Sequence, residues 1–527
     1  MDRTQRATLV ATGLGLFMIF LDALIVNVGL PEIQRAFAVG EAGLQWVVAA
    51  YSLGMAMFIM SAATLADLHG RRRWYLIGIT VFTMASVACG LAPSLEVLNV
   101  ARGVQGVAAA TANVTSLALV SHAFPDPKQK ARAIGIWTAI ASIGTAVGPT
   151  LGGFLVEHWG WRSIFLVNVP VGIVVVAMTL RFVAESRDDR PRTLDLPGQL
   201  LFIATVGAFA YAVIEGPQRG WLSPAILGLF AVTIAGTIAF LRVERRSSDP
   251  MMDITLFRDP AYALAIGTIC AVLFTIYGML LLTTQFLQNV RGYPPQVTGL
   301  MMLPFSASVT IVSPLVGRMV GRFGARLPIM IGLALMIAGL AVLMIGGHAA
   351  TWVVVAGLGI TGSGGAMCLT PITTLAMTSV PPQRAGMASG IMSAQRAIGS
   401  TVGFAVMGSV LAAWLTATLE PDLATVVRDP AERRAVAQAI VASANPRAHV
   451  AEIGPSQPIR YPDPATQAAI VAVAEVDFVQ GIRAALAVAA VVLAAVLLAG
   501  WRWFPRGAGA LIGDAQREET RLAASEP

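Results

Sequence analysis

Apolar segments long enough to cross a lipid bilayer recur along almost the whole chain. Each spans about 20 residues, the length that a helix needs to cross the hydrocarbon core, and is bounded by charged or turn residues. On this basis the sequence predicts fourteen membrane-spanning helices. They are expected near residues 8–30, 45–66, 74–92, 97–120, 134–156, 164–182, 196–214, 224–241, 261–283, 298–317, 328–346, 352–377, 390–418 and 478–502.

The polar connections between these segments differ in charge from one side of the membrane to the other. If both termini lie on one side, that side holds about two thirds of the 36 Lys and Arg residues. Basic residues in short connections keep those connections in the cytoplasm, so the pattern predicts an even number of spans and two cytoplasmic termini. The short loops opposite hold only Arg35, Arg162, Arg219 and Arg291.

The composition excludes an ordinary soluble protein. The chain of 527 residues is 56% hydrophobic and only 12% charged, whereas soluble domains are about 45–50% apolar and about 25% charged. The net charge of +7 would suggest a nucleic-acid partner in a soluble protein, but here membrane topology accounts for it. The lipid bilayer is therefore an expected partner, and nucleic acid is not.

Two short patterns occur twice in the chain, roughly 255 residues apart. Residues 63–73 are echoed at 317–326, and residues 143–148 at 398–403. Such internal repeats are typical of transporters, whose substrate site lies between the related halves. The predicted fold is all-α and integral to the membrane, with two six-helix bundles and two inserted helices. Its parts are 1–183, 184–260, 261–503 with a long extracytoplasmic loop at 419–477, and a cytoplasmic tail at 504–527.

One acidic residue, Asp22, lies well inside a predicted span. A carboxylate in hydrocarbon is costly, so such residues face a cavity or a partner and mark proton or ion pathways. The alternative is a capping or interfacial carboxylate in a span whose position is misjudged. Arg102 and Arg396 also lie inside apolar segments, where a permanent cation needs a partner or water. For Arg102, the alternative is a structural tie to backbone carbonyl groups.

The fifth predicted span combines small residues with a proline. Small residues at a spacing of four allow close helix packing, and proline removes one backbone hydrogen bond. This pattern predicts a bent, closely packed helix that slides during gating, although any tight helix crossing could use the same residues. The residues concerned are Gly144, Gly148, Pro149, Gly152 and Gly153.

The sequence lacks the common motifs of hydrolytic and metal-dependent enzymes. A Walker A motif needs Gly-Lys followed by Ser or Thr, and neither Lys128 nor Lys130 follows a glycine. The five histidines are scattered, with no pair at metal-ligand spacing. We therefore expect neither an enzyme nor a metal site.

Several of these segments resemble signatures of the major facilitator superfamily, and within it the fourteen-helix drug:proton antiporter-2 family. They are residues 21–31, 63–73, 102–106, 144–153 and 161–170. Two positions depart from the usual pattern, since Ala63 replaces a glycine and Gly29 replaces an alanine.

The resemblance implies proton-driven antibiotic export by alternating access, with tetracycline- and spectinomycin-like drugs as cargo. It gives Asp22 the roles of proton carrier and contact for cationic drug, and Arg102 the role of coupling the proton to conformation. It implies no cofactor besides the proton gradient, a monomeric unit, and a multi-pass location in the inner (plasma) membrane of a bacterial cell. The residues that would form a cytoplasmic gate are Asp67, Gly70, Arg71 and Arg72.

Aromatic, amide and basic residues on the helices expected to line the cavity are candidate drug contacts, although each also suits core packing. Two alternatives to drug export remain: export of an endogenous lipid, siderophore or metabolite, and a membrane scaffold or enzyme whose active part lies in residues 419–477. The candidate contacts are Asn27, Tyr51, Gln105, Trp137, Tyr277, Gln285, Gln395 and Arg396.

Overall fold

The computed structural model describes most of the chain, and the regular secondary structure of the described part is helical, with no strand. Within it, fourteen helical segments are long and apolar enough to cross a membrane, as the sequence predicts. The C-terminal tail beyond residue 504 lies outside the described residues, as do parts of five predicted connections. The described residues are 1–187, 195–247, 252, 254–346, 350–378, 380, 385–443, 445–446 and 464–504.

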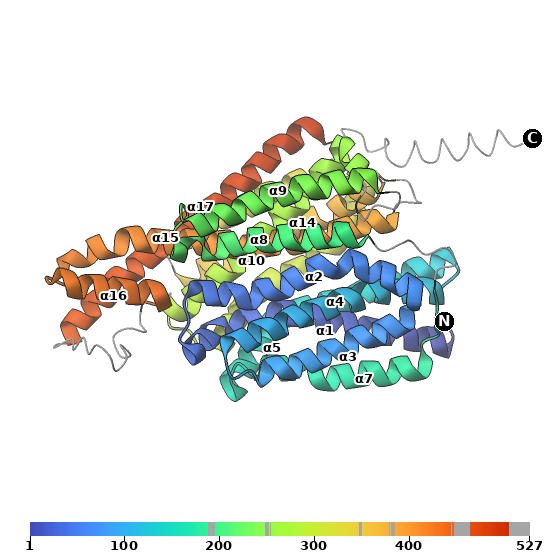
Figure 1. Ribbon diagram of the computed structural model, residues 1–527, viewed down its shortest axis with the longest axis horizontal. Helices are drawn as coiled ribbons and strands as arrows, with labels where there is room; N and C mark the ends of the chain where they lie inside the picture. The colour runs from blue at the N-terminus through green and yellow to red at the C-terminus, as the bar shows by residue number, and fades with distance from the viewer. Residues whose placement is uncertain are drawn as a thin grey trace, which may run out of the picture.

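The first six spans form an N-terminal bundle (Figure 1). Its helix ends follow local chemistry: Asp126 caps the start of α5, where Pro127 is the first residue, and Gly70 separates α2 from α3 at a φ of 108°. The sixth span consists of α6 and α7 together. The helices are α1 (Arg3–Phe37), α2 (Glu41–His69), α3 (Arg71–Gly90), α4 (Leu95–Ala123), α5 (Pro127–Trp159), α6 (Ser163–Leu166) and α7 (Asn168–Phe182).

Two inserted helices, α8 (Leu196–Arg219) and α9 (Pro224–Arg246), lie between the bundles in the sequence. They pack on each other, and α8 also packs on α2 and on α15 of the other bundle (Figure 1). The inserted pair therefore contacts both halves of the molecule. The short helix η1 (Ile254–Arg258) then leads to the second bundle.

The C-terminal bundle contains the last six spans, of which one combines α11 and α12. A short π-helical turn, η2 (Phe286–Val290), ends the first of them. The helices are α10 (Pro260–Gln285), α11 (Pro295–Met301), α12 (Leu303–Phe323), α13 (Arg326–Gly346), α14 (Thr351–Thr378), α15 (Ala385–Asp422) and α17 (Pro464–Trp503).

Two of these helices are much longer than a bilayer requires. With 38 residues in α15 and 40 in α17, both exceed the span length of about 20 residues, and they project from one end of the molecule (Figure 1). Between them lie η4 (Leu423–Thr425) and α16 (Pro430–Ser443). A small apolar core holds this extension together, so the predicted loop at 419–477 is helical over much of its described part. The core residues are Leu419, Leu423, Val427, Val436, Ala437, Ile440, Ile470 and Ala474.

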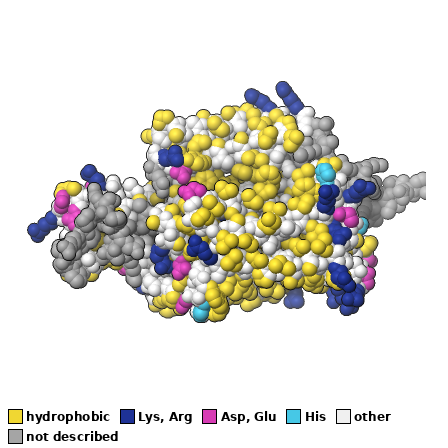
Figure 2. Space-filling view, turned by 60° about the horizontal axis from the view of Figure 1, so that its bottom comes forward, with side chains coloured by type: hydrophobic (Ala, Val, Ile, Leu, Met, Phe, Trp, Pro, Cys, Tyr) yellow, Lys and Arg dark blue, Asp and Glu magenta, His cyan; other side chains and the backbone are white. Residues whose placement is uncertain are grey.

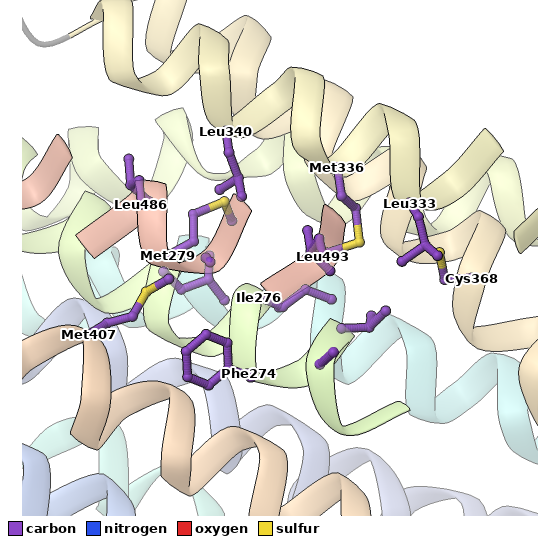
Figure 3. Close-up of a cluster of buried hydrophobic side chains, with 14 of the residues drawn as sticks. Phe274, Ile276, Met279, Leu333, Met336, Leu340, Cys368, Met407, Leu486 and Leu493 are labelled. Carbon is purple, nitrogen blue, oxygen red and sulfur yellow. The ribbon is translucent and has the colours of Figure 1, made fainter. Parts of the chain in front are cut away.

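Apolar side chains serve both as core and as lipid-facing surface. Figure 2 shows hydrophobic side chains over the middle of the molecule, with many basic ones toward the end that carries the N-terminus. Inside the C-terminal bundle, Met279, Met336 and Met407 from three helices join one buried cluster (Figure 3). Lipid is as apolar as leucine, so close packing rather than water exclusion stabilises these helix contacts.

Candidate functional site

A buried ion pair joins α1 to α4. The Arg102 guanidinium Nη1 lies 2.5 Å from Asp22 Oδ2, and both side chains are essentially unexposed. A second guanidinium nitrogen, Nε, donates to the backbone oxygen of Val47 on α2 at 3.1 Å. Close packing makes this reach possible, because a Cβ at Gly106 would overlap the backbone of Tyr51. The glycine in the helix 4 pattern thus brings α4 against α2.

Three further polar residues complete the surroundings of the carboxylate. Gln105 and Asn168 donate to Asp22 Oδ1 at 3.0 and 2.8 Å. Both amides also donate to the Ser86 hydroxyl, at 2.7 and 3.2 Å. Four helices, α1, α3, α4 and α7, thereby contribute to one buried network. A buried charge is tolerated when it is paired and hydrogen-bonded in this way.

Tyr51 connects this network with the cavity between the bundles. The Arg102 guanidinium lies over the Tyr51 ring, 4.4 Å from its centroid, and the Tyr51 hydroxyl donates to the Ile19 backbone oxygen at 3.3 Å. Tyr51 and Ile19 both line the cavity, as does Ala23 beside Asp22. Asp22 itself is not among the lining residues. The proton-carrier candidate therefore lies one side chain behind the cavity wall.

The cavity has a volume of about 340 Å³ and is lined by both bundles. From the N-terminal bundle come residues of α1, α2, α4 and α5, and from the C-terminal bundle residues of α10, α14 and α15. The wall is mainly apolar and aromatic, with a few hydroxyl and amide groups. Among its residues, Arg396 is the one that carries a charge. Such a wall suits an amphiphilic molecule with an aromatic part.

The two bundles close on each other at the end away from the N-terminus. The backbone nitrogen of Gln296 on α11 donates to Glu157 at the end of α5, at 3.1 Å, and Gln288 donates to the Val28 backbone oxygen at 2.9 Å. A Cβ at Gly299 would overlap the carbonyl oxygen of Pro149. These contacts separate the cavity from that end of the molecule.

The glycines of α5 face two different partners. Gly144, Gly148 and Gly152 lie against α1, where a Cβ at Gly144 would come 2.6 Å from the Phe17 carbonyl oxygen. Gly153 lies against Pro295 of α11 in the other bundle. The predicted close packing is therefore present on both faces of α5. Its role in sliding and gating stays a prediction.

The predicted gate residues surround the α2–α3 turn. Arg71 forms an ion pair with Asp67 at 2.8 Å, and the carboxylate of Glu185 accepts hydrogen bonds from the backbone nitrogens of Arg72 and Arg73 at 2.9 and 3.2 Å. Arg72 also donates to the Leu180 backbone oxygen at 2.7 Å. These contacts lie within the N-terminal bundle. Their action as a gate between the two bundles stays a prediction.

The structure distributes the candidate drug contacts over different environments. Tyr51, Trp137, Tyr277 and Arg396 line the cavity, while Gln105 belongs to the Asp22 network. Asn27 and Gln285 are buried outside the lining. Gln395 lines a separate pocket of about 240 Å³ formed by α2, α8, α9, α15 and the region of η1.

Sequence reasoning did not single out three residues that the structure places at these sites. Ser86 and Asn168 hold Asp22, and Glu185 holds the start of α3. Asn168 lies in the segment 161–170 that resembles a family signature, so a signal for it was present. Nothing in the local pattern distinguishes Ser86 from other serines inside apolar helices.

A cavity between two helical bundles, with a buried carboxylate–arginine pair behind its wall, defines a secondary membrane transporter. A model of the Major Facilitator Superfamily matches residues 12–404. The chain belongs to this superfamily, which confirms the predicted fold class and a multi-pass membrane location.

Several relatives match over nearly the full chain. The chain is 67% identical to the "Multidrug resistance protein Stp" of Mycobacterium tuberculosis, covering 96% of this chain and 93% of that protein. It is 46% identical to the "Drug efflux pump JefA" of the same organism, covering 96% and 99%. A bacterial homologue of the human lysosomal transporter Spinster, solved in an inward-facing and occupied conformation, shares the fold with a TM-score of 0.67. Sequence identity there is 18%, with 96% of this chain and 98% of the other covered.

Proposed function

We propose that this transporter is a drug:proton antiporter that exports antibiotics, including tetracycline- and spectinomycin-like molecules, across the bacterial plasma membrane. The observation that carries the proposal is the contact chain from Asp22 through Arg102 to Tyr51, because Tyr51 is also part of the cavity wall. The names of the relatives support drug efflux as the activity. No cofactor is needed, and the single chain contains a complete cavity, so the monomer is the working unit.

Protonation of Asp22 provides the coupling step. A proton on this carboxylate removes its charge and weakens the ion pair with Arg102. Arg102 also holds Val47 on α2 and stacks on Tyr51, so its release alters the cavity wall and the α1–α4 contact together. Drug binding and proton binding then favour different arrangements of the two bundles, which is the requirement for exchange.

The charge of the loops supports the orientation. The basic side, which carries both termini, faces the cytoplasm, and the contacts of Glu157 and Val28 with α11 and η2 close the opposite, external end. In this conformation drug enters from the cytoplasmic side. A proton moving inward gains about 2.3 kcal/mol per 100 mV of membrane potential, which drives the uphill export.

The proposal is tested by efflux of tetracycline and spectinomycin from a pump-deficient bacterial host. We expect the wild-type chain to lower drug accumulation in a manner that an uncoupler abolishes, and Asp22→Asn to lose this activity at equal membrane abundance. Glu96→Gln is the matched control, because it removes an exposed carboxylate from α4. Full efflux by Asp22→Asn would contradict the proposed role of Asp22. Efflux of neither drug by the wild type would contradict antibiotic export and favour an endogenous cargo.

A further inference from the structure

The cavity contains a cation with no carboxylate partner among its lining residues. Arg396 of α15 donates from Nη2 to the hydroxyl of Thr373 on α14 at 2.8 Å. Both residues line the cavity, and none of the other lining residues carries a charge. The partner that the structure records for this guanidinium is therefore neutral.

Arg102 shows how an arginine with a carboxylate partner is held in this protein. Its guanidinium contacts the Asp22 carboxylate, the Gln105 side-chain oxygen and the Val47 backbone oxygen. An arginine has five N–H donors in a planar fork. Arg396 uses one of them in its described hydrogen bond, and its side chain borders the cavity. A charged group inside a membrane protein needs a partner, and for Arg396 the cavity is where that partner can bind.

A second unmatched donor lies on the other bundle. The indole nitrogen of Trp137 on α5 is buried without a hydrogen-bond partner among the described residues. Trp137 lines the same cavity as Arg396. The indole N–H can only donate. Its nitrogen is buried rather than exposed to the cavity, so the charged donor that a ligand meets in the cavity is Arg396.

The carboxylate that would attract a cation is not available in this conformation. Asp22 is fully buried, and its oxygens are occupied by Arg102, Gln105 and Asn168. The Asp22–Arg102 pair is electrically neutral as a unit. The net charge offered to a ligand therefore comes from Arg396 and is positive.

We propose that Arg396 binds an anionic group of those exported molecules that carry one, so that among aromatic amphiphiles the cavity prefers those bearing a carboxylate or enolate over simple cations of similar shape. This inference rests on the proposed export function, because it names the substrate class of the same cavity. Arginine is suited to the task, since its planar fork matches the two oxygens of such an anion. The aromatic side chains of the wall pack against the rest of the molecule.

The test compares two dyes with one ring system and different charge. Rhodamine 110 carries a free carboxylate, whereas its methyl ester, rhodamine 123, is a simple cation. Binding to the purified full-length protein in lipid nanodiscs is followed by fluorescence anisotropy, without any proton gradient. We expect the wild type to bind rhodamine 110 about tenfold more tightly, as a charge-assisted hydrogen bond predicts.

Substitutions of Arg396 show whether the preference for rhodamine 110 depends on the charge of this side chain or on its shape. We expect Arg396→Gln to remove the preference for rhodamine 110, and Arg396→Lys to keep part of it. Arg219→Gln, which removes an exposed arginine beyond the cavity, should leave the preference unchanged. Equal or tighter binding of rhodamine 123 by the wild type would overturn the inference, as would failure to bind either dye. The inference is equally overturned by a preference that survives in Arg396→Gln. If this variant fails to fold, the wild-type comparison still decides.

A transport measurement distinguishes failure of this inference from failure of the proposed function. In proteoliposomes, Asp22→Asn should retain the binding preference but lose proton-driven transport. If dye transport does not depend on the proton gradient but rhodamine 110 still binds more tightly, the antiport mechanism is contradicted and Arg396 remains the anion site. If transport is proton-driven but the two dyes bind equally well, only the anion site is contradicted.

Discussion

A methyl group added at Gly299 should open the external end of the cavity. Gly299 of α11 lies against the backbone of α5, where a Cβ would overlap the carbonyl oxygen of Pro149. The neighbouring backbone atoms belong to helices and cannot move aside as a flexible side chain would. Overpacking of this kind costs about 1–3 kcal/mol, and the strain acts only while the two bundles are in contact. Gly299→Ala should therefore destabilise the externally closed state.

The shift in population follows from this energy. Each 1.4 kcal/mol changes an equilibrium constant tenfold, so the externally open state should gain about 5- to 150-fold relative to the closed one. A cysteine introduced at Ser393, which lines the cavity, reports the change through its reaction with a membrane-impermeant maleimide added outside intact cells. Of the native cysteines, Cys89 and Cys368 are buried, and Cys270 is replaced by serine to remove background.

A matched glycine controls for helix propensity. Gly135 lies on α5, where an added methyl group would meet no atom of a neighbouring element within 4 Å, so Gly135→Ala gains the same helix propensity without a clash. We expect external labelling to rise in Gly299→Ala and to remain at the wild-type level in Gly135→Ala. Equal labelling of all three proteins would refute the view that the Gly299 contact holds the external end closed.

Three further predictions concern residues outside the cavity. Asn168→Leu removes a hydrogen bond to a charged carboxylate, worth about 1.5–3 kcal/mol, and should lower uncoupler-sensitive efflux about tenfold while drug binding without a gradient persists. Glu185→Gln weakens the charge-assisted contacts at the start of α3 and should lower both thermal stability and efflux. Ile440→Ala truncates the core of the α15–α17 extension, should cost about 2–4 kcal/mol there, and should increase protease cleavage within α16 while efflux continues.

Each of these three has an outcome that would count against it. Unchanged efflux by Asn168→Leu would show that Arg102 and Gln105 suffice to hold Asp22. If Glu185→Gln melts at the wild-type temperature and exports drug at the wild-type rate, the contacts of Glu185 with the start of α3 contribute neither to stability nor to efflux. Loss of all efflux in Ile440→Ala at normal membrane abundance would mean that the extension takes part in transport.

The fold was predictable because the thickness of the bilayer fixes the length of each membrane-spanning helix. The apolar segments of that length can be recognised from the hydropathy of the sequence. Helix ends outside the bilayer were not predictable in this way. The first span was expected near 8–30 but extends over Arg3–Phe37, because polar residues in water continue the helix without changing the hydropathy signal. For the same reason, α15 runs to Asp422 and α16 lies within a segment expected to be a loop.

The site was predictable residue by residue, but not as an assembly. Asp22 and Arg102 each stand out as charges in apolar helices, yet their pairing depends on how α1 crosses α4, 80 residues apart in sequence. The rotation of each helix about its own axis could not be predicted from the sequence either. Gln395 and Arg396 are adjacent, but they line different pockets on different faces of α15. A helix turns by about 100° per residue, and the sequence alone does not say which face meets the cavity.

The charge of the exported molecule determines which part of the proton gradient does the work. If one proton enters for each zwitterion that leaves, one positive charge moves inward, and the potential contributes about 2.3 kcal/mol per 100 mV besides about 1.36 kcal/mol per pH unit. For 100 mV and one pH unit, the sum of about 3.7 kcal/mol sustains a drug gradient of roughly 500-fold. If a simple cation leaves instead, the charges cancel, and the pH difference alone sustains a drug gradient of roughly tenfold.

An anion site at Arg396 therefore gives the pump a larger driving force. A potassium–valinomycin potential imposed at equal pH should drive the transport of rhodamine 110 but not that of rhodamine 123. Rhodamine 110 transport that does not respond to this potential would contradict the exchange of one inward proton for one outward zwitterion.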